Sequence, residues 1–260
     1  MVANKALGQH WLKNRGILDE IADLVALGSA CDYSEKTGVE EVKLCVEIGP
    51  GLGTLTSSLL RRFEKVLAIE YDTKLANNLP KSFPGKNLEV INADILQFDF
   101  STISEKYVIA GNIPYYITSP IIEKVLTAPK LPERVVLLMQ KEVAERILDE
   151  KETMLSLFVK NRANVWAGPV VLRDEFTPPP KVDSEVVVFE PHLPVAGDDV
   201  FNLIKIGFRS PRKKLIHNLS GLKDKKKLEE ILRELEIDLN ARPGDLKLEK
   251  WQKLKNKLNN

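Results

Sequence analysis

The chain has 260 residues, 43% of them hydrophobic, and a formal net charge of +1. This length is enough for one full α/β domain and a small second domain, while ordinary glycine and proline contents exclude collagen-like and disordered chains. The sequence has no run of about 18 apolar residues and no apolar signal segment near its start, so we expect a soluble, cytoplasmic protein without a membrane span.

Apolar runs alternate with amphipathic stretches up to about residue 190. In chain order, helices are expected at residues 16–27, 54–62, 72–79, 120–126, 141–148 and 154–164, and strands at 42–48, 65–70, 88–94, 107–112 and 134–139. Residues 165–172 and 184–189 can pair as an antiparallel edge. Strands that alternate with helices predict an α/β fold with a mostly parallel sheet and helices on both faces.

A boundary follows at Pro191, Pro194 and Gly197, and beyond it only helices are expected, at residues 199–208, 213–218, 225–235 and 248–258. We therefore expect an α/β domain over residues 1–193 and an all-helical domain over 194–260. Residues 196–260 contain 16 Lys and Arg against 10 Asp and Glu, so this part carries +6 and the preceding part −5. A basic part on an otherwise acidic chain suggests a polyanionic partner, although a Lys-rich solvated helix face fits the charge equally well.

A glycine-rich turn, Glu47-Ile-Gly49-Pro-Gly51-Leu-Gly53, follows one predicted strand and opens a helix. Such glycines allow a tight turn and a close approach of the backbone to a ligand. The dinucleotide motif G-x-G-x-x-G has its third glycine one residue later, so a dinucleotide site is disfavoured. The Glu47 carboxylate favours a cationic or hydroxyl-bearing ligand over a pyrophosphate. A structural turn without a ligand is the alternative.

Two further carboxylates end the next two strands. Glu70 lies 17 residues after Gly53, where an acidic residue commonly binds the ribose hydroxyls of an adenosine. Asp94 is placed to accept a hydrogen bond from an adenine amino group. Each carboxylate alone is more often a solvated strand end, but three strand ends in one crevice together indicate an adenosyl ligand.

The fourth strand ends in Asn112-Ile113-Pro114-Tyr115. Adenine N6 is a poor nucleophile because its lone pair is delocalised into the ring, so an enzyme has to orient this amine toward a sulfonium methyl. The Asn112 amide oxygen and the Ile113 carbonyl can accept the two N–H groups, Pro114 stiffens the turn, and Tyr115 can stack on the base. No strong general base is needed, because the proton leaves after the amine has become cationic. An ordinary proline turn is the alternative.

A basic run near the start of a predicted helix contains Arg209, Arg212, Lys213 and Lys214. We expect these side chains to contact RNA phosphates, which positions an RNA without reading its sequence and weakens steeply with added salt. A solvated helix surface is the alternative. No metal site is expected.

In order and spacing, the motifs resemble those of the small-subunit ribosomal RNA adenine N6,N6-dimethyltransferases. The resemblance extends over residues 7–218. Its segments are Gly8-Gln-His-Trp-Leu12, Glu47-Ile-Gly-Pro-Gly-Leu-Gly53, Ile69-Glu70, Asn92-Ala-Asp94, Asn112-Ile-Pro-Tyr115, Gln140-Lys-Glu-Val-Ala-Glu-Arg146, Phe176-Thr-Pro-Pro-Pro-Lys-Val-Asp-Ser184 and Arg212-Lys-Lys-Leu215.

The resemblance implies a class I methyltransferase (Rossmann-like) fold with a small helical C-terminal domain. It implies transfer of two methyls from S-adenosylmethionine to each of two adjacent adenines near the 3′ end of small-subunit rRNA, by a monomer that acts on this rRNA or on a precursor of the small subunit. It also implies that Phe176 is a second stacking surface for the flipped adenine. The residues expected to contact the cofactor, from the turn and from the resemblance, are His10, Leu12, Glu47, Gly49, Gly51, Gly53, Glu70, Asp94 and Asn112.

The chain departs from the family pattern where His10 and Trp11 replace the usual Asn and Phe, and where Thr153-Met154 replace the usual Tyr-Gly. Two other functions stay open. Large-subunit rRNA adenine methyltransferases that give antibiotic resistance share the glycine turn and the Asn-Ile-Pro-Tyr motif, but the segment 176–184 favours the small-subunit enzymes. A non-catalytic ribosome-assembly RNA-binding protein is the third reading, against which the intact Glu70, Asp94 and Asn112 argue.

Overall fold

The computed structural model describes residues 9–27 and 42–259. They fall into two compact units. Unit 1 comprises the chain up to residue 144 together with residues 164–191, and unit 2 comprises residues 145–163 and 192–260.

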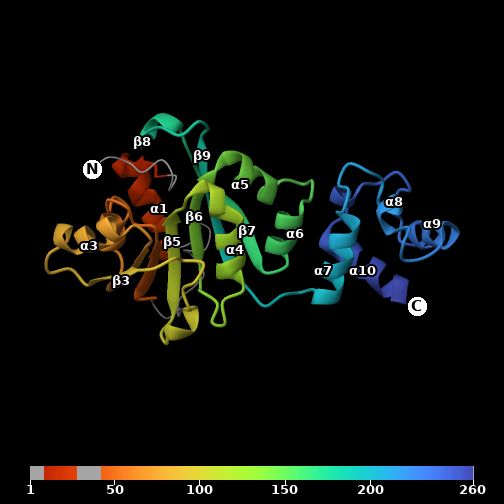
Figure 1. The fold of residues 1–260 in the computed structure, drawn as a ribbon, viewed down its shortest axis with the longest axis horizontal. Helices are drawn as coiled ribbons and strands as arrows, with labels where there is room; N and C mark the ends of the chain where they lie inside the picture. Colours follow the sequence, from red (N-terminus) through yellow and green to blue (C-terminus); the bar gives the residue numbers. More distant parts are fainter. Residues whose placement is uncertain (1–8, 28–41, 260) are drawn as a thin grey trace. The chain divides into compact units, whose positions relative to one another are not determined.

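A seven-stranded sheet in the order β4-β3-β2-β5-β6-β9-β7 forms the centre of unit 1 (Figure 1). The strands are β2 (Leu44–Ile48), β3 (Lys65–Glu70), β4 (Leu88–Asn92), β5 (Tyr107–Asn112), β6 (Val135–Gln140), β7 (Ala163–Val171) and β9 (Ser184–Pro191). The strands from β2 to β6 pair in parallel, and β9 pairs antiparallel with β6. The mostly parallel sheet predicted from the alternating pattern is therefore confirmed.

Helices cover both faces of this sheet, as the burial of β5 shows. Val108 and Ala110 pack in one apolar cluster with Leu18 and Ile21, whereas the alternate residues Tyr107 and Ile109 are buried on the opposite face. The helices of this part are α1 (Arg15–Leu27), α2 (Thr56–Leu59), α3 (Thr73–Ser82) and α4 (Thr118–Leu126), with 3₁₀ turns η3 (Phe100–Thr102), η4 (Tyr115–Ile117) and η5 (Arg173–Glu175). α5 (Lys141–Leu148) begins in unit 1, and its residues from 145 onward belong to unit 2.

The parallel register brings four strand ends to one edge of the sheet. Ile48 at the end of β2 lies beside Ile69 and Gly111, and Glu70 at the end of β3 lies beside Asn92. The residues that follow these strands therefore meet at the carboxyl edge, where ligands of open α/β sheets bind.

A second, two-stranded sheet was not predicted from the sequence. β1 (Trp11–Leu12) pairs antiparallel with β8 (Phe176–Thr177), with Trp11 opposite Thr177 and Leu12 opposite Phe176. Strands of two residues are too short to show an alternating pattern, so only the structure reveals this pairing. It joins the N-terminal segment to the proline-rich segment 176–184.

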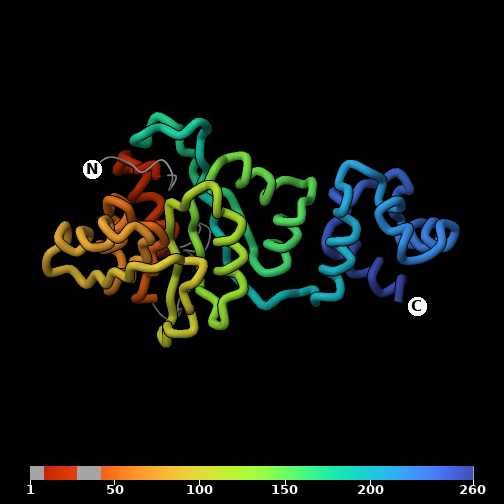
Figure 2. Tube along the Cα trace, in the orientation of Figure 1, coloured from red at the N-terminus to blue at the C-terminus, as the bar shows by residue number. Residues whose placement is uncertain are grey.

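Unit 2 is all-helical around one apolar core, and Figure 2 traces its C-terminal helices from α7 to α10. Its elements are α6 (Met154–Lys160), α7 (Asp198–Gly207), α8 (Leu215–Leu219), α9 (Lys225–Glu234), η6 (Pro243–Asp245) and α10 (Leu248–Asn259). The largest core side chain, Trp251, is fully buried. The helical C-terminal part expected from the sequence is confirmed.

Residues 145–163 belong to unit 2, although the sequence pattern placed them in the first domain. Leu157 of α6 lies in the unit 2 core, and the buried Glu152 carboxylate accepts hydrogen bonds from Lys160 and Lys247. The predicted helix 154–164 ends at Lys160, because the Asn161 side chain forms reciprocal hydrogen bonds with the backbone of Ala196 at 2.7 and 3.1 Å. The functional division into a methyltransferase domain and an RNA-contacting domain stays a prediction.

Among residues 9–27 and 42–259, every helix is too short or too polar to span a lipid bilayer.

Candidate functional site

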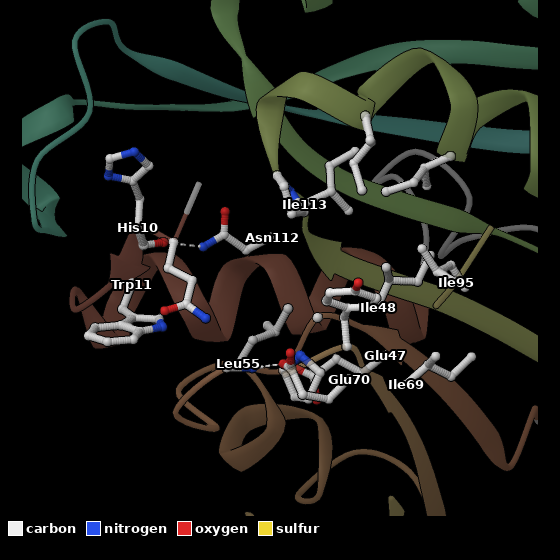
Figure 3. Close-up of a pocket in the computed structure, with 18 of the residues that line it drawn as sticks. His10, Trp11, Glu47, Ile48, Leu55, Ile69, Glu70, Ile95, Asn112 and Ile113 are labelled. Atoms are coloured by element: carbon white, nitrogen blue, oxygen red, sulfur yellow. Dashed lines mark hydrogen bonds between the residues drawn. The ribbon is translucent and has the colours of Figure 1, made fainter. Parts of the chain in front are cut away.

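A cavity of about 310 Å³ lies at the carboxyl edge of the sheet in unit 1. The ends of β2, β3 and β5 and the residues after β4 form its wall, and the segment around His10 closes one side (Figure 3). The predicted site residues that line it are His10, Leu12, Glu47, Gly49, Gly51, Glu70, Asp94, Asn112, Ile113, Pro114 and Tyr115. Residues from 10 to 115 in the sequence thus meet around one space.

The glycine-rich turn and Glu70 form a single hydrogen-bonded unit. Gly49 and Gly51 have φ of 65° and 59°, a region that a side chain disfavours. In this conformation the Gly51 N–H donates to Glu70 Oε2 at 3.0 Å, and the Asp72 N–H donates to Glu70 Oε1 at 2.8 Å. The pKa of the Glu70 carboxyl is raised above its ordinary value, and burial is the largest cause of this shift. The strand end and the turn therefore hold the carboxyl in a fixed place.

Glu47, immediately before the turn, is 1% exposed, and its Oε2 atom has no hydrogen-bond partner among the described residues. Burial, with a smaller contribution from the charge of Glu70, raises the pKa of Glu47 to about 8. A buried acceptor without a partner is costly, so its position at the cavity wall indicates a ligand that supplies a donor or a positive charge.

Three acidic side chains line the cavity, those of Glu47, Glu70 and Asp94. Among residues 9–27 and 42–259, no Lys or Arg lines it. A pyrophosphate would therefore meet three acidic side chains and no Lys or Arg of the described residues, whereas a ligand with a positive charge and hydroxyl groups meets matching partners. The residues fit the net positive charge and the ribose hydroxyls of S-adenosylmethionine and do not fit a dinucleotide.

Asn112 is the last residue of β5, and the nitrogen and oxygen of its side-chain amide point in different directions. Its amide nitrogen donates to the His10 carbonyl at 2.8 Å, which leaves the amide oxygen directed away from His10 (Figure 3). The hydrogen bond thus fixes which end of the amide is presented as an acceptor. Ile113, the next residue, is 2% exposed and donates its N–H to the Leu138 carbonyl at 3.3 Å, which anchors the turn to β6.

Two rings lie beside this turn. His10 and Tyr115 stack at a centroid distance of 5.8 Å with 16° between their planes. His10 Nδ1 donates to the Pro178 carbonyl at 2.8 Å, and the Tyr115 hydroxyl hydrogen-bonds with Ser184 Oγ at 2.7 Å. Both rings are therefore oriented by the segment 176–184, and burial raises the pKa of Tyr115, which keeps its hydroxyl protonated.

Two predicted site residues lie away from the cavity wall. Phe176 is 1% exposed and packs in the core with Leu12 and Val171, so stacking on a base would require its ring to leave that core. Gly53 also does not line the cavity, and a Cβ there would come within 2.8 Å of Phe83 and Leu79 side chains. Trp11 and the 63% exposed Tyr116 line the cavity but were not predicted as site residues, because an aromatic side chain alone does not distinguish a site from a core.

Of the four basic residues predicted to contact RNA, only two line the same cavity. Arg209 and Lys213 line a second cavity with His217. Arg212 and Lys214 do not line that cavity, and Lys214 donates to the Asn240 side chain. All four side chains are exposed. Their predicted contact with RNA stays a prediction.

Comparison with known proteins gives consistent matches over nearly the whole chain. The family model for ribosomal RNA adenine dimethylases matches residues 2–260. Ribosomal RNA small subunit methyltransferase A of Rippkaea orientalis is 35% identical over 95% of this chain and 94% of its own length. The crystal structure of a Plasmodium falciparum dimethyladenosine transferase gives a TM-score of 0.75 at 30% identity and covers 94% of this chain and 96% of its own. That of the 23S rRNA methyltransferase ErmE gives a TM-score of 0.76 at 25% identity and covers 96% of this chain and 100% of its own.

The mostly parallel sheet, with a cavity at its carboxyl edge, and the likeness to solved methyltransferases define a class I methyltransferase fold, as the sequence resemblance implied. Within that class, the chain belongs to the ribosomal RNA adenine dimethylase family.

Proposed function

We propose that this chain transfers methyl groups from S-adenosylmethionine to N6 of two adjacent adenines near the 3′ end of small-subunit rRNA. One observation carries the proposal: three carboxylates at strand ends and the Asn112 turn line the same cavity. The relatives at about 35% identity that are named small-subunit methyltransferases support the choice of RNA. The proposed enzyme acts as a monomer in the cytoplasm, on rRNA or on a precursor of the small subunit.

The acidic part of the cavity is the proposed cofactor site. Glu70 would hold the ribose hydroxyls, Asp94 the adenine amino group, and the Gly49–Gly51 turn would allow close approach of the backbone. Glu47 would face the positive charge of the ligand. When bound there, S-adenosylmethionine supplies an electrophilic methyl group on a cationic sulfur.

The Asn112 turn is the proposed site of the substrate amine. Asn112 Oδ1 and the Ile113 carbonyl would accept the two N–H groups, which turns the nitrogen lone pair toward the methyl donor. Tyr115 would stack on the extruded base, with its ring held by Ser184. The methylated nitrogen then becomes cationic and loses its proton to water, so the chain needs no strong base at this point.

A large-subunit rRNA is the second candidate substrate, because the likeness to ErmE is as high as that to the dimethyladenosine transferase by TM-score. The lower sequence identity of 25%, against 35% for the small-subunit relative, favours the small subunit.

The test is methyl transfer in vitro with isotope-labelled cofactor, on precursor small subunits and on both purified rRNAs from a strain that lacks the enzyme. Mass spectrometry of nuclease fragments should find N6,N6-dimethyladenosine in a 3′-terminal fragment of the small-subunit RNA. Dimethyladenosine only in the large-subunit RNA would overturn the choice of substrate. Cofactor binding by calorimetry without transfer to any RNA would overturn the catalytic assignment.

A further inference from the structure

Trp11 lines the cavity of unit 1 at a position where the family usually has Phe. It belongs to β1, the short strand that pairs with β8, where Trp11 lies opposite Thr177. An indole ring has one hydrogen-bond donor that a phenyl ring lacks, its N–H group. Whatever this N–H group binds is therefore a feature of this chain that the family pattern does not supply.

The nitrogen edge of the indole lies against the glycine-rich turn. A Cβ atom at Gly51 would lie 2.9 Å from Trp11 Nε1, which is too close for any side chain, so the glycine is what allows the indole to approach. The indole nitrogen is on the side of the ring that faces Leu55 and Glu70 (Figure 3). The N–H group therefore stands at the wall of the cavity.

Other donors of this wall already have acceptors within the chain. The Gly51 N–H donates to Glu70 Oε2 at 3.0 Å. The Asn112 amide nitrogen donates to the His10 carbonyl at 2.8 Å. By contrast, Trp11 Nε1 donates no hydrogen bond to residues 9–27 or 42–259. An N–H group without a partner at a cavity wall favours a ligand that brings an acceptor.

The charges around the cavity decide which acceptor fits. S-adenosylmethionine carries a carboxylate at the amino acid end, together with a positive sulfonium and a positive ammonium group. The carboxylate finds no favourable partner in Glu47, Glu70 or Asp94, and no Lys or Arg of the described part of the chain lines the cavity. The edge of an aromatic ring is electropositive, so the N–H edge of Trp11 attracts the carboxylate and repels the sulfonium.

We propose that the Trp11 indole N–H donates a hydrogen bond to the carboxylate of bound S-adenosylmethionine and thereby makes this chain selective for ligands that carry that carboxylate. The proposal rests on the proposed function in that S-adenosylmethionine is the ligand. Trp11 holds the amino acid end of the cofactor, whereas Asn112 faces the substrate amine. Phe at position 11 would keep an aromatic ring there and lose the hydrogen bond.

The indole N–H signals of the wild-type protein give the first test by NMR. The sequence has three tryptophans, and Trp166 and Trp251 do not line the cavity. S-adenosylmethionine should move the indole proton of Trp11 downfield, because its N–H group gains a charged acceptor. Decarboxylated S-adenosylmethionine, which keeps the sulfonium and the adenosine, should move it much less, and the Trp166 signal should stay in place with both ligands. Equal movement of the Trp11 signal with the two ligands, or none with S-adenosylmethionine bound, would overturn the proposal.

Affinities for the same two ligands, measured by calorimetry, give the second test. Trp11→Phe should weaken binding of S-adenosylmethionine about tenfold, the loss expected for a hydrogen bond to a charged group, and leave binding of the decarboxylated ligand within about twofold. The matched control is Trp166→Phe, which makes the same change at a ring that packs against the apolar core and does not line the cavity. It should leave both affinities unchanged. Equal losses for the two ligands in Trp11→Phe would mean that the ring supplies contact area alone, which would overturn the role of the N–H group.

The outcomes separate the role of Trp11 from the proposed enzyme, because both ligand tests proceed without RNA. Methyl transfer to rRNA together with equal losses for the two ligands would leave the enzyme and remove the hydrogen bond. A carboxylate-dependent shift of the Trp11 signal without methyl transfer to any RNA would leave the hydrogen bond on a chain that is not the proposed enzyme. A chain that binds neither ligand would overturn both.

Discussion

At the scale of single residues, one hydrogen bond of Asn112 decides which end of its side-chain amide is free to face a ligand. Its amide nitrogen is bound to the His10 carbonyl, so the oxygen is the end available to a substrate amine. We expect Asn112→Ala to lower the turnover number at least about 100-fold, because the amine loses its orienting acceptor. Cofactor affinity should stay within about tenfold, since Glu47, Glu70 and Asp94 remain. Steady-state transfer and calorimetry measure the two quantities.

Asn87→Ala is the control for this prediction. Asn87 also donates its side-chain amide to a carbonyl, that of Glu64 at 3.0 Å, but it precedes β4 and lies at the opposite edge of the sheet. Its loss should leave turnover unchanged. Wild-type turnover in Asn112→Ala would contradict the assigned role.

The buried carboxyl of Glu47 leads us to predict that the stability of the cofactor-free chain depends on pH. Burial raises its pKa to about 8, so the folded chain keeps a proton that the unfolded chain releases above its ordinary pKa of 4.5. Between about pH 5 and 8 the unfolded state binds fewer protons, and the free energy of unfolding should fall by up to about 1.4 kcal/mol per pH unit. Urea unfolding at several pH values measures this slope.

Glu47→Gln should flatten that slope, because the amide does not titrate. Glu64→Gln is the matched control, since Glu64 pairs with Lys43 at the surface and its side chain is 63% exposed. A slope that is the same in Glu47→Gln and in the wild type would show that other groups cause the pH dependence.

The residues that line the cavity of unit 1 were predictable where a strand end fixes their position. Glu70 and Asn112 end strands of a parallel sheet and Asp94 follows one, so the register brings them together. The stacked pair of His10 and Tyr115 was not predictable, because it depends on a contact over more than 100 positions. Phe176 was expected at the site from the resemblance alone, and the pairing of β8 with β1 carries its ring into the core.

At the scale of elements, the segment 176–184 acts on the site through two hydrogen bonds. The Pro178 carbonyl holds the His10 ring, and Ser184 Oγ holds the Tyr115 hydroxyl. The segment therefore positions both rings without supplying one itself.

If this hydrogen bond positions the Tyr115 ring, substitutions at Ser184 and Tyr115 should have coupled effects on turnover. Ser184→Ala and Tyr115→Phe each remove the same hydrogen bond, so each should lower the turnover number by about three- to tenfold, corresponding to about 1 kcal/mol. The double variant should lose no more than the larger single loss, which a double-mutant cycle on the turnover number measures. Strictly additive losses would contradict the coupling.

The core strands were predicted almost to the residue, but element ends were not. β3 and β5 match the predicted ranges because continuous apolar runs with a sharp polar boundary define them. The end of α6 depends instead on the contact of Asn161 with Ala196, 35 positions away, which no local pattern records.

At the scale of the whole molecule, the grouping of residues 145–163 with the C-terminal helices determines where the chain can be divided. Met154, Leu157 and Phe158 of α6 pack into the unit 2 core with α7, α8, α9 and α10. A chain that ends at Pro191 keeps α6 but loses the helices that cover it. These apolar side chains would then be exposed together, a patch of the kind that drives association.

We therefore expect the chain ending at Pro191 to self-associate, as measured by size-exclusion chromatography with light scattering against the full-length protein. In the shortened chain, Met154→Gln, Leu157→Gln and Phe158→Gln together should restore the monomer, because they remove the exposed patch without changing the sheet. If the chain ending at Pro191 is monomeric without these changes, α6 is stable without the C-terminal helices. The domain boundary predicted near residue 193 would then separate two parts that are stable independently. If the triple change fails to restore the monomer, the association arises from another surface, and the packing of α6 does not explain it.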